Sequence, residues 1–243
     1  KKEPLSAKYI RKLLGSVEFL NSKNRWCLWL NNLDFKDLEF MPQVQERIKR
    51  VQEARLNSTR NATKKLASTS HLFGEIRQPS NNYLIIPRVS SENRYYVPFG
   101  YINKNVIVTD RCAFIENANL SLFGVMTSSM HMTWMKATCG RLKTDYNYSI
   151  QLVYNTFPFP NITKKQKEEL TELTFNILDG REQHSEKTLA QLYDPDKMPQ
   201  GLKEAHHELD LAIEKCYRNK PFENDEERLE YLFKLYEEMI SKE

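Results

Sequence analysis

The chain has 243 residues, of which 40% are hydrophobic, and its formal net charge is +4. This length accommodates one large domain or two smaller ones. No apolar run approaches the length of a membrane span, and the four cysteines form no CxxC pair. We therefore expect no membrane partner, neither a zinc site nor a disulfide framework, and a location in the reducing cytoplasm. Because the sequence starts without a methionine, we also expect it to be a piece of a longer polypeptide.

The small net charge hides a strong asymmetry between the two parts of the chain. Residues 1–160 contain 23 Lys and Arg against 12 Asp and Glu, whereas residues 161–243 contain 13 against 20. A basic region of this size is suited to a polyanionic partner, because cationic side chains release condensed counterions from phosphates. We expect a domain at residues 1–160 and a second one at 161–243.

The first third of the chain predicts mixed structure. A short basic helix is expected over residues 6–14, ended by Gly15, followed by a strand at residues 25–30. Good helix formers fill residues 41–58, where Val44 and Ile48 lie on one side and basic residues cover much of the rest.

Residues 83–109 change to short β-rich runs, in which Pro87 and Pro98 favour strand ends or edges. Residues 120–140 return to helical spacing, with a stripe of Phe123, Met126, Met130 and Trp134 and a C-terminal cap at Gly140. A last strand is expected within 146–157, before the proline-rich hinge.

The region after the hinge predicts helices. Thr163 and Gln166 have the spacing of a capping box, Asn224 and Glu227 repeat it, and an apolar stripe runs from Leu202 to Cys216. The predicted fold class is therefore α+β: a mixed domain with short, mostly antiparallel strands, then a small all-helical domain.

No catalytic or metal site is expected in this chain. It has no GxGxxG, Walker or GxSxG motif. His131, Cys139 and Asp145 are close in sequence but do not make a convincing nucleophilic set, and adjacent His206 and His207 point about 100° apart on a helix. The Asp-Pro-Asp-Lys run at residues 194–197 indicates a turn between helices.

Four blocks of sequence resemble the C-terminal portion of MmeI-like Type IIL restriction-modification enzymes. They occur in the family's order and reach from Leu14 to Tyr217: LGSVEFLNSKNRWCLWL, LIIPRVSSENRYYVPFG, LFGVMTSSMHMTWMKATCGRLKTDYNYS with VYNTFPFP, and LAQLYDPDKMPQGLKEAHHELDLAIEKCY.

The resemblance implies a non-catalytic module of a bacterial enzyme that recognises a sequence in double-stranded DNA. In that family one polypeptide also carries an adenine-specific methyltransferase that binds S-adenosylmethionine, and a nuclease that needs Mg²⁺ where it is present. The partners implied here are duplex DNA and the methyltransferase domain of the same polypeptide, whereas this segment holds no cofactor of its own.

Two groups of residues are the candidates for DNA contact. Phosphate contacts set the register of a protein on DNA, whereas side chains in the major groove read base edges. We assign phosphate positioning to a polar segment that leaves a strand and is typical of the family: Arg88, Ser90, Ser91, Asn93 and Arg94. We expect base readout where the family pattern is looser: Lys104, Arg111, His131, Lys136, Arg141, Lys143 and Asp145.

Alternatives remain open at this point. The serines and Asn93 could instead build a turn, with Arg94 paired to Glu92, and Arg141 could contact phosphate. The main functional alternative is an RNA- or single-strand-binding module that uses an aromatic platform of Tyr95, Tyr96, Phe99 and Tyr101. A protein-interaction scaffold working through the acidic tail is a third reading.

Overall fold

The computed structural model describes residues 3–241, and the chain folds into two compact units. Unit 1 contains residues 1–13, 24–78 and 105–108, and unit 2 contains residues 14–23, 79–104 and 109–243. The units therefore interleave along the chain. The predicted division into domains at 1–160 and 161–243 rests on charge and on the proline-rich hinge, and it stays a prediction.

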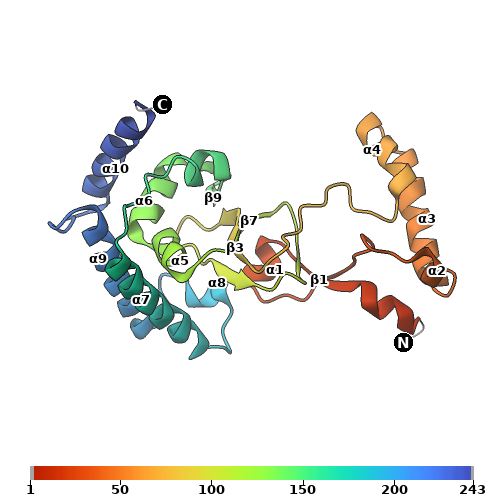
Figure 1. The fold of residues 1–243 in the computed structure, drawn as a ribbon, viewed down its shortest axis with the longest axis horizontal. Coiled ribbons are helices and arrows are strands. Elements are labelled where there is room, and N and C mark those ends of the chain that lie inside the picture. Colours follow the sequence, from red (N-terminus) through yellow and green to blue (C-terminus); the bar gives the residue numbers. More distant parts are fainter. Residues whose placement is uncertain (1–2, 242–243) are drawn as a thin grey trace. The chain divides into compact units, whose positions relative to one another are not determined.

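Unit 1 combines a small sheet with a helical hairpin (Figure 1). The sheet has the order β2-β1-β6, formed by Trp26–Leu28, Ile10–Leu14 and Ile107–Val108. The helices are α2 (Phe35–Leu38), α3 (Pro42–Leu56) and α4 (Asn61–Lys65), with 3-10 turns at Pro4–Tyr9 and Leu66–Thr69. A small core contains Tyr9, Leu30, Met41 and Val44.

One predicted element of unit 1 is wrong. The basic helix expected over 6–14 is a 3-10 turn that ends at Tyr9, followed by strand β1. Antiparallel pairing of Arg11 with Cys27 in β2 gives this segment backbone partners that local helix propensity did not anticipate. The strand at 25–30 and the long helix at 41–58 are confirmed.

Two three-stranded sheets lie in unit 2. In the first, β3 (Tyr83–Pro87) is fully buried between β5 (Gly100–Ile102) and β7 (Cys112–Glu116), and it is antiparallel to both. Pro87 ends the central strand, as its missing N–H requires. The second sheet has the order β4-β9-β8, formed by Val89–Ser90, Asp145–Asn147 and Gly140–Leu142.

Helices fill the rest of unit 2: α1 (Ser16–Leu20), α5 (Leu120–Thr127), α6 (Ser129–Thr138), α7 (Lys164–Glu182), α8 (Leu189–Leu192), α9 (Gln200–Tyr217) and α10 (Asp225–Ile240). The predicted stripe of Phe123, Met126, Met130 and Trp134 is buried in a core shared with α7 and α9. The helix predicted over 120–140 is two helices that meet at Ser128, and Gly140 begins β8 instead of capping α6. The strand predicted within 146–157 is present only as β9, because a π-helical turn follows at Ile150–Tyr154.

Buried polar groups join the C-terminal helices to the preceding residues of unit 2. Asp210 on α9 accepts a hydrogen bond of 2.7 Å from the Tyr96 hydroxyl and another of 2.7 Å from the Ser129 backbone N–H at the start of α6. Arg181 on α7 donates to the carbonyl oxygen of Phe99 over 2.6 Å and to the Tyr193 hydroxyl over 2.7 Å. Helices α7 and α9 are therefore part of the same packed body as residues 96–129.

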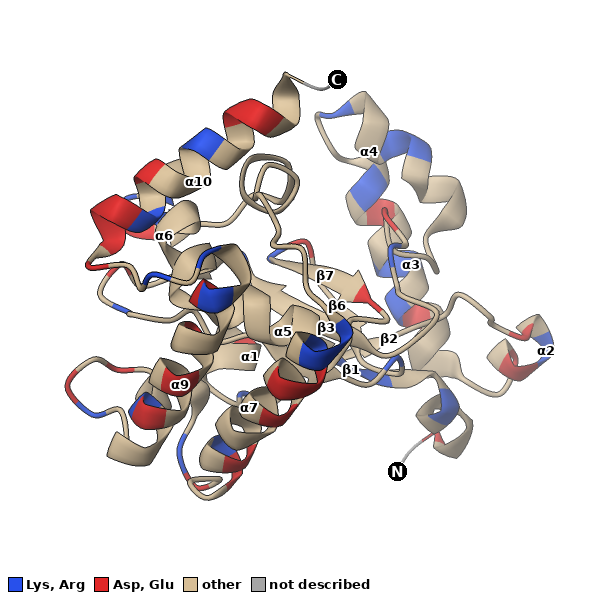
Figure 2. Ribbon diagram, turned by 60° about the vertical axis from the view of Figure 1, so that its left-hand side comes forward, with Lys and Arg blue, Asp and Glu red and all other residues tan. Residues whose placement is uncertain are grey.

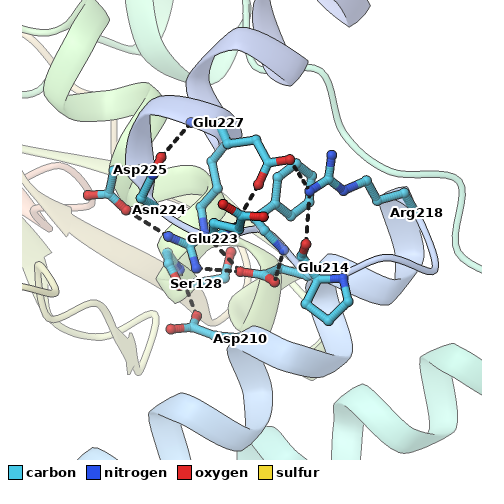
Figure 3. Close-up of polar contacts among 12 residues, drawn as sticks. Ser128, Asp210, Glu214, Arg218, Glu223, Asn224, Asp225 and Glu227 are labelled. Carbon is cyan, nitrogen blue, oxygen red and sulfur yellow. Dashed lines mark hydrogen bonds and ion pairs between the residues drawn. The ribbon is translucent and has the colours of Figure 1, made fainter.

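The acidic C-terminal helices also bind each other through ion pairs. Glu214 on α9 is buried and forms an ion pair with Arg228 of α10, with 2.6 Å between Arg228 Nη2 and Glu214 Oε1. Arg218 pairs with Glu227 at 2.7 Å, next to the Asn224 cap of α10 (Figure 3). The fold is thus α+β, as predicted, with short antiparallel strands and a helical C-terminal part. No helix among residues 3–241 is long and apolar enough to span a membrane.

Candidate nucleic-acid interface

The sheet β4-β9-β8 brings members of the two predicted groups of DNA-contacting residues together. Ser90 of β4 and Arg141 of β8 are both register partners of Tyr146 in the central strand β9. Paired residues of antiparallel strands lie on the same face, so Ser90, Tyr146 and Arg141 share one face of the sheet. The two groups are far apart along the sequence and were predicted to have separate roles; the strand pairing makes them neighbours.

Arg88 connects this sheet to the strand region before β7. Its backbone N–H donates to the Arg111 carbonyl over 3.1 Å, and its carbonyl accepts from the Tyr148 N–H over 2.7 Å. The Arg88 side chain is half-buried, and its Nε has no hydrogen-bond partner among the described residues. Arg111 is exposed beside it. One member of each predicted group thus lies at this edge.

The polar segment after β4 forms a local turn. The Ser91 hydroxyl accepts from the Asn93 N–H over 3.3 Å, and Arg94 Nη1 donates to the buried Ser90 hydroxyl over 3.0 Å. Burial lowers the pKa of Arg94, and the nearby carboxylates of Asp145 and Asp194 act in the opposite direction by raising it. The hydrogen bond between Ser91 and Asn93 agrees with the turn-building alternative, whereas Ser90 lies in strand β4. The alternative pairing of Arg94 with Glu92 is wrong, because Glu92 lies 3.5 Å from Arg141 instead.

The β8–β9 hairpin presents charged groups to solvent. Lys143 is exposed at the turn with a φ of 57°, a left-handed conformation that is uncommon outside glycine. The Arg141 guanidinium lies 4.3 Å from the centre of the Tyr146 ring and donates to the Thr144 carbonyl over 3.0 Å. Its side chain is 44% exposed. Asp145 is half-buried at the start of β9. The hairpin therefore holds Arg141 in place while Lys143 projects at the tip.

Besides Arg111, three base-readout candidates lie outside this sheet. His131 is fully buried, contacts the Tyr148 hydroxyl at 3.1 Å and packs edge-on against Phe157. Burial lowers its pKa to about 3, so it is a neutral core residue and its assignment to base readout is wrong. Lys136 pairs with Asp225 at 3.2 Å. Lys104 follows β5, where its backbone N–H donates to Asn82.

The aromatic platform proposed for single-strand binding is not formed. Tyr96 stacks on His206 with 4.1 Å between ring centroids, and Phe99 is fully buried. Tyr101 stacks on Phe123 in the same unit. Only Tyr95 of the four is strongly exposed, at 61%, so no surface array of rings is available for successive bases.

The sequence positions that suggested chemistry have structural roles. His206 is buried and contacts the Tyr193 hydroxyl at 2.8 Å, and burial lowers its pKa well below the ordinary value. Asp194 and Asp196 lie in the turn between α8 and α9, as expected. Within residues 3–241 no group of three or more His, Cys, Asp or Glu side chains could hold a metal ion.

One exposed residue of the site was not singled out from the sequence. Asn147 in β9 alternates with the buried residues Tyr146 and Tyr148, so it shares the opposite face with Asp145. An amide at such a position is suited to adenine. The period-two pattern Asp-Tyr-Asn-Tyr was the available signal.

Known proteins similar to this chain agree with the resemblance in sequence. The family model described as "MmeI, target recognition domain" matches residues 1–161, and the model "MmeI, C-terminal domain" matches residues 162–242. DNA methyltransferase A of Bacillus subtilis (strain 168) is 46% identical over 241 residues, which cover 99% of this chain and 27% of that protein.

A solved structure gives the same result in three dimensions. The Type IIL restriction-modification enzyme MmeI, determined in complex with DNA, superposes with a TM-score of 0.96 at 43% identity. The match covers 98% of this chain and 32% of that one. The chain thus spans about a quarter to a third of the length of these relatives. It belongs to the MmeI family, whose target recognition and C-terminal domain models match residues 1–161 and 162–242.

Proposed function

We propose that this chain selects the DNA sequence on which a larger restriction-modification methyltransferase acts, and that it is not catalytic by itself. The observation that carries the proposal is that members of both predicted residue groups, Ser90 and Arg141, meet on the sheet β4-β9-β8. The names of the relatives support it, since one is a DNA methyltransferase and the other was solved with DNA bound.

The proposal assigns the chemistry to the remainder of the polypeptide. That part would bind S-adenosylmethionine and methylate an adenine turned out of the duplex, with Mg²⁺ required where a nuclease is also present. The methyltransferase domain is then the second partner of this chain, after duplex DNA, and the working location is the cytoplasm. Residues 1–160 choose the sequence, and residues 161–243 support them structurally.

Within the interface, the position and constraint of each side chain separate the roles. Arg88, between β3 and β4, and Asn93 and Arg94, after β4, contact phosphates, which fixes the register of the protein on the duplex. Lys143, projecting at the hairpin tip, and Asp145 beside it are the strongest base readers, because a lysine can donate to guanine and a carboxylate can accept from cytosine. Arg141, constrained by Tyr146 and Thr144, reads a base only in its present orientation.

Substitutions in the full-length polypeptide separate these roles. Lys143→Ala, and independently Arg141→Ala, should relax or change the methylated motif at one position, each at a cost of about 1–3 kcal/mol against the correct base. Arg88→Ala should weaken methylation of all sites uniformly without changing the motif. Motifs are measured by sequencing modified adenines in cells that express each variant.

The controls follow from the same geometry. Glu116→Gln removes an exposed charge at the end of β7, which is in unit 2 but not in the sheet β4-β9-β8. This variant should leave the motif unchanged. If both Lys143→Ala and Arg141→Ala left the motif and the activity unchanged, the β8–β9 hairpin would not be part of the interface. Competition by single-stranded RNA that exceeds competition by duplex DNA would contradict the proposal as a whole.

A further inference from the structure

Most of the basic charge of residues 1–160 lies in unit 1, outside the sheet β4-β9-β8. Unit 1 contains 15 Lys and Arg against seven Asp and Glu. The residues of 1–160 that belong to unit 2 contain eight against five. The candidate base-reading sheet is therefore in the less basic unit, and none of the DNA-contacting residues named so far lies in the more basic one.

A helical hairpin at residues 42–69 carries seven of the 15 Lys and Arg of unit 1 but only two of its seven Asp and Glu. Helix α3 contacts both α4 and the 3-10 turn at Leu66–Thr69. Arg55, near the end of α3, closes the hairpin by donating to the carbonyl oxygens of Leu66, Thr69 and Leu72 over 2.8, 3.0 and 2.8 Å. This arginine is half-buried and structural, so it is not part of the charged surface.

Four other cations on the two helices are exposed and have no carboxylate within ion-pair distance among residues 3–241: Arg47 and Lys49 on α3, and Lys64 and Lys65 on α4. Figure 2 shows Lys and Arg along both helices. The C-terminal helices differ, since Arg218, Arg228 and Lys234 each pair with a glutamate. Unpaired positive charges on one hairpin repel one another, and a bound polyanion relieves this repulsion.

We infer that the α3–α4 hairpin is a second DNA contact, which binds the phosphate backbone of the duplex through Arg47, Lys49, Lys64 and Lys65 without reading bases. This inference rests on the proposed function. Duplex DNA is the occupant because the four groups are single positive charges on two adjoining helices, and a regular array of phosphates matches such a surface. The contact supplies affinity common to all sequences, and the β4-β9-β8 sheet supplies the choice among them.

The test measures how DNA binding depends on salt. In the full-length polypeptide, Arg47, Lys49, Lys64 and Lys65 are all changed to Gln, and binding to random-sequence duplex DNA is titrated over a range of salt concentrations. Each lost phosphate contact lowers the slope of log affinity against log salt by about 0.9, so the slope should fall by about 3 to 4. The methylated motif should stay the same.

A matched control removes four exposed lysines of the acidic C-terminal region, with Lys164, Lys165, Lys167 and Lys187 all changed to Gln. This control should leave the slope unchanged. Four single Gln variants of the hairpin, each expected to lower the slope by about 0.9, replace the quadruple variant if it does not fold.

Three results would overturn the inference: an unchanged slope in the hairpin variant, an equal fall in the control, or a changed motif. Failure of the proposed function is distinct from these, because Lys143→Ala and Arg141→Ala would then leave the methylated motif unchanged, whatever the salt dependence of the α3–α4 variant. An unchanged slope in a variant of a polypeptide that still methylates its motif would refute the hairpin contact alone.

Discussion

Asp210 links the C-terminal helix α9 to the segment that precedes the interface, and its ionisation should be visible in the stability of the chain. Burial raises the pKa of Asp210 from its ordinary value of 3.8 to about 6, against the hydrogen bonds from Ser129 and Tyr96 that lower it. Between these two values the folded chain holds a proton that the unfolded chain has released. Stability from this group is therefore complete below pH 4 and is lost as the pH rises through 6.

The magnitude follows from the size of the shift. A difference of about two pKa units corresponds to about 3 kcal/mol of unfolding free energy. Asp210→Asn removes the ionisation while its side-chain oxygen can still accept from the Ser129 N–H. The stability of the original chain relative to Asp210→Asn should thus fall by about 2–3 kcal/mol between pH 4 and pH 7.

Urea unfolding of both chains at several pH values measures this difference. Asp196→Asn is a matched control, because it makes the same substitution at an exposed position in the turn before α9. If the original chain and Asp210→Asn lost stability in parallel from pH 4 to pH 7, Asp210 would not be buried against Tyr96 and Ser129.

Three further predictions concern the same packed body. A methyl group at Gly124 would lie 2.6 Å from Thr174 Oγ1, so Gly124→Ala should lower the unfolding free energy by about 1–3 kcal/mol, and adding Thr174→Ala should recover part of it in a double-mutant cycle. Burial lowers the pKa of His131 to about 3, so the stability that this residue contributes is complete above pH 6.5 and is lost on acidification. In chemical unfolding, His131→Gln should therefore reduce the loss of unfolding free energy between pH 6.5 and pH 4 by about 3 kcal/mol. An acid dependence identical to that of the original chain would contradict the burial of His131. Arg181→Met leaves the Phe99 carbonyl without its donor and should cost about 1–3 kcal/mol in thermal or urea unfolding, whereas no change would show that this bond is not formed.

Local patterns predicted the helices well and the strands less well. The Thr163 capping box and the apolar stripes depend on residues three and four positions apart, and the structure has those helices. Strand β1 depends instead on pairing with β2, which lies across a turn and helix α1. Its residues include good helix formers, and no local signal opposed a helix there.

The break at Ser128 shows a second limit of sequence reasoning. The Ser128 hydroxyl donates to the Val125 carbonyl over 2.7 Å, and Asp210 receives the next N–H of the chain. A carboxylate 81 residues away therefore helps to start a new helix. The hydroxyl is a recognisable cap, but nothing in the adjacent sequence predicts its distant partner.

The candidate site was predictable as a set of residues but not as an arrangement. Composition and family resemblance selected Arg88 to Arg94 and Arg141 to Asp145, and the antiparallel pairing of β4 and β8 with β9 made them adjacent. The same reasoning wrongly included His131, because spacing alone could not show which face of α6 meets Tyr148 and Phe157.

Segment exchange tests the central claim most directly. Residues 1–243 would replace the corresponding 241-residue region of DNA methyltransferase A of Bacillus subtilis, which is 46% identical, and methylated sites would be mapped in cells that express the chimera. Exchanging the whole segment keeps the Asp210 and Arg181 contacts intact. We expect the chimera to methylate a new motif, the one that this chain specifies in its own polypeptide. An active chimera that still methylated the motif of the Bacillus enzyme would contradict the account.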